Sequence, residues 1–275
     1  MTGPRPASPG GVLSTVLTAT AAYAVTRAVQ AAHRADRFPG GSARWERPNH
    51  AGQPLTLTEG PALTAGTMAP LLLADPPTAC VVAGAALAGA LDDLGGDSRA
   101  KGLRGHLGAA RRGQLTTGTI KIGALGATGL LGAAASDHRD GRGLGLHTLA
   151  GAGLVAGGAN LANLFDLRPG RALKVGLACG IPLLLTGRPA AAAVTGASLA
   201  VLPDDLAARS MLGDTGANPL GAALGAAAVQ QLSPRSRWVA LAVVTGLTLL
   251  SERVSFSRVI GSTPVLRRLD DWGRG

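Results

Sequence analysis

Long apolar segments alternate with short polar ones along almost the whole chain of 275 residues. Apolar runs that approach 20 residues are typical of helices that cross a lipid bilayer. Several of the runs here are shorter than the usual ~20 residues, so these helices would tilt little, break, or use flanking polar residues. The pattern predicts about nine helices, at residues 11–31, 60–74, 77–91, 118–135, 144–165, 172–187, 189–202, 217–232 and 236–251.

The composition favours a polytopic, all-α membrane protein over a soluble Ala/Gly-rich domain. The chain is 46% hydrophobic and only 15% charged, and it contains 41 glycines, which suit close contacts between helices inside a membrane. No long polar linker divides the sequence, so we expect one domain over residues 1–275. The segments 1–10 and about 263–275 are interpreted as tails, the second being a cytoplasmic or interfacial extension.

The net charge of +10 is explained best by membrane topology, because aromatic residues make up only 3% of the chain and provide no stacking surface for nucleic acid. With the N-terminus outside, most of the 26 Lys and Arg residues fall in loops on the inner side, as the positive-inside rule requires. The same orientation puts Asp92, Asp93, Asp166 and Asp214 at the cytoplasmic face.

The pair Asp92-Asp93 ends the third apolar segment, directly before a basic loop that contains Lys101, and Lys121 lies at the start of the next segment. Adjacent carboxylates can hold a divalent cation or accept a proton, and nearby cations can neutralise phosphoryl oxygens. The pattern therefore suits phosphate chemistry, although an acidic pair by itself also occurs at ordinary helix ends.

Two further polar groups sit at the edges of apolar segments. Asn160, Asn163 and Asp166 follow one another at i, i+3 and i+6, close to one helical face, and their hard oxygens suit a metal ion, a phosphate or a ribose. Asp214 lies between Gly213 and Gly216, which allow a tight loop, so it is either a ligand-binding acid or an ordinary N-cap.

Together these motifs, with the stretch 47–54, resemble the polyprenyl-phosphate N-acetylhexosamine-1-phosphate transferase family, which includes the phospho-N-acetylmuramoyl-pentapeptide transferases. The resemblance covers residues 45–260 approximately. It implies Mg²⁺-dependent transfer of a sugar-1-phosphate from a UDP-sugar to a polyprenyl phosphate, with release of UMP, at a bacterial-type plasma membrane. It assigns catalytic roles to Asp92, Asp93 and Asp214, substrate binding to Lys101, Lys121, Asn160 and Asn163, and the Mg²⁺ ligand to Asp166.

Two other functions stay open beside this one. The family's His-rich segment has no counterpart after the ninth apolar segment, so a non-catalytic relative that binds lipid-linked precursors or an envelope partner is the alternative. An ion-coupled transporter is disfavoured, because transport sites lie near the middle of the bilayer. The spacings Gly153-x-x-x-Gly157 and Gly221-x-x-x-Gly225 allow close helix contacts within one bundle or between the subunits of a homodimer.

Overall fold

A computed structural model describes residues 9–39, 41, 45–48, 54–95 and 117–274, and within them the fold is almost entirely helical. All nine predicted apolar segments fall on helices. The long helices of the described chain are α1 (Pro9–Arg34), α2 (Glu59–Ala74), α3 (Pro76–Gly95), α5 (Thr117–Arg139), α6 (Leu146–Phe165), α7 (Arg171–Leu184), α8 (Pro189–Leu206), α9 (Gly213–Val229) and α10 (Pro234–Ser251).

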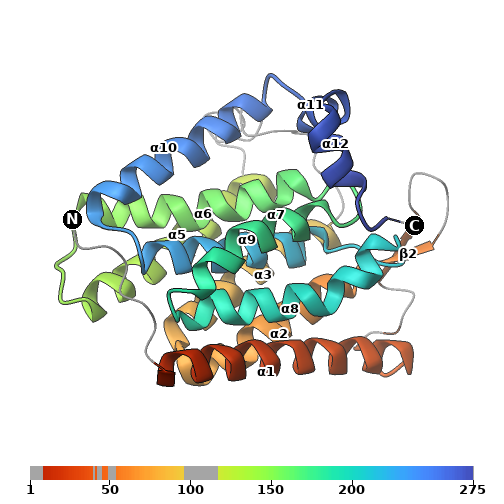
Figure 1. Cartoon of the computed structure of the whole chain (residues 1–275), viewed down its shortest axis with the longest axis horizontal. Helices are drawn as coiled ribbons and strands as arrows, with labels where there is room; N and C mark the ends of the chain where they lie inside the picture. The colour runs from red at the N-terminus through yellow and green to blue at the C-terminus, as the bar shows by residue number, and fades with distance from the viewer. Residues whose placement is uncertain (1–8, 40, 42–44, 49–53, 96–116, 275) are drawn as a thin grey trace.

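These helices run back and forth along one direction (Figure 1). Short connections join α2 to α3 and each consecutive pair of helices from α5 to α10, so the ends of these helices alternate between the two ends of the bundle. The end of α3 meets the start of α9, where the Asp93 carboxylate accepts a hydrogen bond from the Asp214 amide. At the opposite end, Arg237 at the start of α10 pairs with Asp137 near the end of α5. The alternation therefore gathers the predicted acidic residues at one end.

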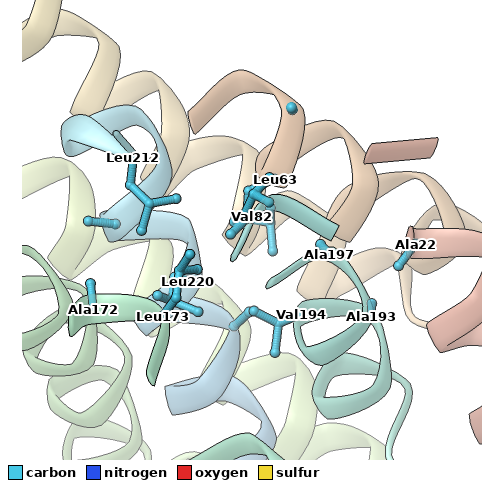
Figure 2. Close-up of a cluster of buried hydrophobic side chains, with 14 of the residues drawn as sticks. Ala22, Leu63, Val82, Ala172, Leu173, Ala193, Val194, Ala197, Leu212 and Leu220 are labelled. Carbon is cyan, nitrogen blue, oxygen red and sulfur yellow. The ribbon is translucent and has the colours of Figure 1, made fainter. Parts of the chain in front are cut away.

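Helix α9 is the centre of the bundle, because its Gly- and Ala-rich sequence lets neighbours approach from every side. A Cβ on Gly221 would lie 2.0 Å from the carbonyl oxygen of Gly158 in α6, which shows how closely the two backbones pass. Leu220 of α9 belongs to a buried apolar cluster with Leu173 of α7 and Val194 of α8 (Figure 2). A second cluster joins α9 to α3, α5 and α6.

Three helices in the described chain are long and apolar enough to cross a membrane, at Gly11–Arg34, Gly118–Arg139 and Leu146–Phe165. A fourth candidate is the pair Pro234–Ser251 and Phe256–Ser262, which is bent by 90°. These findings confirm the all-α class and support a membrane protein. The count of nine spans stays a prediction, because helices such as α7, with 14 residues, are short for a bilayer.

Four short elements were not predicted. Strands β1 (Glu46–Pro48) and β2 (Pro54–Thr56) form an antiparallel hairpin after α1. The segment interpreted as a C-terminal tail contains helix α12 (Pro264–Asp271), which follows the short helix α11 (Phe256–Ser262). Both helices lie at the same end of the bundle as the hairpin (Figure 1).

Candidate functional site

The N-terminus of α9 collects carboxylates from two other helices. The Asp93 carboxylate accepts hydrogen bonds from the amides of Asp214 at 3.1 Å and Thr215 at 2.8 Å, and from the Thr215 hydroxyl at 2.6 Å. The Asp166 carboxylate accepts a hydrogen bond from the Gly213 amide. Amides in the first turn of a helix have no partner within the helix and carry partial positive charge, so carboxylates stabilise them. Asp93 and Asp166 therefore hold the start of α9 in place.

Glycine is required where these groups meet. Gly213 has a φ of +58°, in the left-handed region that side chains disfavour. A Cβ at this position would also lie 2.9 Å from a carboxylate oxygen of Asp93. The loop before α9 can consequently approach Asp93 of α3 closely. The side chain of Asp214 points away from Asp93, toward α5.

On that side, Asp214 forms an ion pair with Lys121 from the first turns of α5. The Lys121 ammonium also lies 3.3 Å from the Asp92 carboxylate. One cation is thus held between two carboxylates that come from α3 and α9. Adjacent positions on a helix point about 100° apart, which explains why Asp92 reaches Lys121 whereas Asp93 turns to the α9 backbone.

Asp92, Lys121 and Asp214 line a cavity of about 440 Å³ between α3, α5, α6, α9 and α10. Its size is in the range of ligand sites for small molecules. Polar groups cover one part of the wall, and apolar groups cover the rest, among them Ile122, Leu125, Ala156, Gly157, Val244 and Leu249. The cavity can therefore receive a molecule with a charged end and an apolar body.

The predicted polar face of α6 is divided between the cavity and the protein interior. Asn160 and Asn163 line the cavity, and the Asn160 amide donates a hydrogen bond of 3.3 Å to the Thr248 hydroxyl of α10. Asp166 is not among the lining residues. Burial raises the pKa of the Asp166 carboxyl well above its usual range, and the neighbouring carboxylates of Asp205 and Asp214 raise it further. Its Oδ2 atom is buried and has no hydrogen-bond partner within the described part of the chain.

The structure thus brings seven of the eight predicted site residues to one end of the bundle, around the start of α9. The eighth, Lys101, lies outside the described residues. No group of three His, Cys, Asp or Glu side chains within the described ranges is arranged to hold a metal ion. An ion at this site would accordingly need ligands from amides, water or a substrate as well.

Sequence reasoning missed several residues of this region. Glu252 lines the cavity, Thr215 binds Asp93, and Thr248 binds Asn160. Glu59 and Asp205, each 1% exposed, add two buried carboxylates at the same end. The sequence does contain a signal for Glu252. Like the predicted acids, it follows an apolar segment and is close to a basic residue, Arg253.

A scan against known protein families finds no match for this chain, and a search of curated proteins finds none either.

Proposed function

We propose that this protein is an integral membrane enzyme that transfers a sugar-1-phosphate of the N-acetylhexosamine type from a UDP-sugar to a polyprenyl phosphate. The observation that carries the proposal is the cavity that joins a polar wall, with Asp92, Lys121 and Asp214, to an apolar wall formed by α5, α6 and α10. A polyprenyl phosphate has the same division, with an anionic head and a long apolar chain. The motif resemblance supports the same reaction independently.

In the proposed reaction, an oxygen of the lipid phosphate forms a bond to the phosphorus that carries the sugar. The bond from that phosphorus to the bridging oxygen breaks, and UMP leaves with that oxygen. Phosphoryl transfer depends mainly on alignment and on neutralising charge. Lys121 would bind phosphate oxygens, and Asp92 and Asp214 would orient the lipid phosphate or accept its proton.

The amides of Asn160 and Asn163 are in place to bind the donor, since both line the cavity one helical turn apart on α6. Lys101 would add a further positive charge. Asp93 and Asp166 would keep the start of α9, and hence Asp214, in position. The proposal therefore divides the acids between those that contact substrate and those that fix the site, with Asp166 also available to a metal ion.

The residues fit a Mg²⁺ ion, because the buried Oδ2 atom of Asp166 has no hydrogen-bond partner within the described chain and sits among other carboxylates. Mg²⁺ commonly takes one or two protein carboxylates and completes its shell with water and substrate phosphates. Such a site needs no cluster of three acidic side chains. When bound, the ion would supply positive charge for the diphosphate of the donor, which would have to extend from the cavity toward Asp166, since Asp166 does not line the cavity itself.

We further propose nine membrane spans with the N-terminus outside, which puts the acidic end of the bundle at the cytoplasmic face of a bacterial-type plasma membrane. The excess of Lys and Arg in the loops of one side supports this orientation. The back-and-forth path of the helices is consistent with it (Figure 1). UDP-sugars are cytoplasmic substrates, so the donor would reach the cavity from that side.

The test uses membranes that contain the full chain, a panel of UDP-sugars and a polyprenyl phosphate, with UMP release and mass spectrometry of the lipid as measurements. We expect UMP release that requires Mg²⁺ and is lost in Lys121→Met, Asp214→Asn and Asp166→Asn. Asp140→Asn is the matched control, because Asp140 is exposed and pairs with Arg142. Silence with every donor, together with intact lipid binding, would favour a non-catalytic relative instead.

A further inference from the structure

The last two helices form an amphipathic segment whose apolar side faces outward. Helix α11 departs from α10 at an angle of 90°, and α12 follows directly. Val265, Leu269 and Trp272 recur at i, i+4 and i+7, so they share one face of α12 and its end. Their exposed fractions are 66%, 60% and 74%. An apolar face that stays exposed while the opposite side of the helix packs on the protein marks a surface that binds another molecule or a membrane.

The segment is held in this orientation by two cations of α7. Arg171, which is 3% exposed, donates from Nε and Nη2 to the two carboxylate oxygens of Asp270 at 2.7 and 2.8 Å, and from Nη1 to the Ser257 hydroxyl at 2.8 Å. The Lys174 ammonium donates to the backbone carbonyls of Asp270 at 2.5 Å and Trp272 at 2.9 Å. A bidentate arginine pair fixes direction as well as distance. The polar side of α12 is thereby turned to the bundle, and the apolar side cannot turn inward.

Exposed arginines outnumber exposed acids in this segment by four to two, the acids being Glu252 and Asp271. Four exposed arginines belong to α11, α12 and the turn before them, at Arg253, Arg258, Arg267 and Arg268. The one exposed acid of α12, Asp271, lies 3.3 Å from the guanidinium of Arg274. An exposed apolar face on a segment that also exposes four arginines matches the surface of an anionic leaflet, where side chains enter the acyl boundary and guanidinium groups meet lipid phosphates.

The preceding helix indicates where that leaflet lies. α10 qualifies as a candidate membrane span only together with α11, and most of the length of this bent pair belongs to α10, whose side chains Val239, Val243 and Leu250 are exposed at 67%, 58% and 47%. Helix α12 then lies crosswise to α10 at its far end (Figure 1). A helix that crosses a bilayer and turns by 90° at its end continues in the plane of the interface.

We propose that α11 and α12 form an in-plane anchor that binds the surface of an anionic leaflet, with Val265, Leu269 and Trp272 inserted and the arginines on lipid phosphates. The inference goes beyond the proposed enzyme function and does not depend on it. It concerns only the contact between this segment and lipid, and its test needs no substrate.

The test uses the full chain with Trp45 and Trp238 replaced by Phe, so that Trp272 is the remaining tryptophan. The chain is reconstituted in nanodiscs of phosphatidylcholine alone or mixed with phosphatidylglycerol, in which some lipids carry bromine near the headgroup. We expect bromine to quench Trp272, acrylamide to quench it weakly, and the bromine effect to increase with the anionic lipid. Arg258→Gln/Arg268→Gln should lose that increase.

The matched control is Arg37→Gln/Arg235→Gln, which removes the same charge at two other exposed positions and should keep the increase. If an arginine variant fails to fold, the quenching of Trp272 in the chain that keeps all its arginines still decides the proposal. Strong acrylamide quenching without bromine quenching would overturn it. Protection of Trp272 from both quenchers would show that protein, such as a second copy of the chain, covers the face. Equal bromine quenching in both bilayers would refute the anionic specificity.

Discussion

Asp93 and Asp92 are neighbours in sequence, yet the structure predicts opposite consequences for their removal. Asp93 accepts hydrogen bonds from the Asp214 amide, the Thr215 amide and the Thr215 hydroxyl. Asp93 takes the place of an N-cap side chain for α9, because the N-cap residue, Leu212, has an apolar side chain that cannot accept a hydrogen bond. Asp92 lies 3.3 Å from Lys121 and also contacts the Asp214 carboxyl, but it bonds no backbone amide of α9 among the described residues, and its side chain is 28% exposed.

The expected magnitudes follow from these contacts. Loss of a helix cap costs about 0.5–2 kcal/mol, and a donor left without its charged acceptor costs a similar amount. Asp93→Ala should therefore lower the free energy of unfolding by about 2–4 kcal/mol. Asp93→Asn should cost less, since the amide oxygen still accepts. Asp92→Ala should cost less than ~1 kcal/mol, as is usual for partly exposed ion pairs.

The assay is thermal unfolding of the purified chain in detergent, followed by tryptophan fluorescence. A change of 2–4 kcal/mol corresponds to a fall in the midpoint of roughly 5–15 °C for a chain of this size. Asp92→Ala serves as the matched control, and it should lose the proposed transfer activity while keeping its midpoint. Equal midpoints for Asp93→Ala and Asp92→Ala would refute the assignment of Asp93 as the cap of α9.

Three further predictions concern helix packing, a buried charge and pH. Gly89→Ala should destabilise the fold by about 1–3 kcal/mol, because its Cβ would lie 2.1 Å from a backbone oxygen at the start of α9. Gly126→Ala should stabilise it slightly, because its Cβ would meet no described atom within 4 Å outside the backbone of its own helix. Arg237→Met should cost at most about 3–5 kcal/mol, since the carboxylate of Asp137 is 0% exposed and would keep only the partly exposed Arg142 as a fixed cation beside it; a midpoint near that of the unaltered chain would contradict this. The Arg171 guanidinium lowers the pKa of Asp270 to about 2, so the stabilisation is present above the usual value of 3.8 and is lost as the pH falls from about 4 to about 2. Trp272 fluorescence, recorded as above without the other tryptophans, should show this transition, and Asp270→Asn should abolish it.

The helices could be predicted from the sequence because their apolar segments are long and are separated by clear polar breaks. Each of the nine predicted segments coincides with one helix, although the predicted 144–165, 172–187 and 217–232 extend two or three residues beyond α6, α7 and α9. The largest unpredicted features depend on contacts between distant residues. Arg171 and Asp270 are 99 positions apart, and neither residue type signals the other, so α12 was interpreted as part of a tail.

The sequence predicted which residues gather at the candidate site. It did not predict which of them face the cavity and which bind the backbone of α9. The sequence shows Asp92 and Asp93 as equivalent acids, because a pattern of residue types contains no direction in space. Which of the two reaches Lys121 depends on the rotation of α3 against α9, and this rotation is set by close contacts such as Gly89 against the Asp214 carbonyl. The same argument applies to Asp166, which ends α6 and turns toward Gly213 instead of the cavity.

The charges on the cavity wall argue that a cation belongs to the proposed reaction. Asp92, Asp214 and Glu252 line the cavity, and Lys121 is the one Lys or Arg among the described lining residues. A diphosphate donor and a lipid phosphate would bring several more negative charges into a partly apolar space, where repulsion between like charges is strong. Lys121 is already paired with two carboxylates, so it cannot offset this repulsion alone. If the enzyme acts as proposed, donor binding should therefore weaken when Mg²⁺ is removed, even in conditions where no transfer can occur.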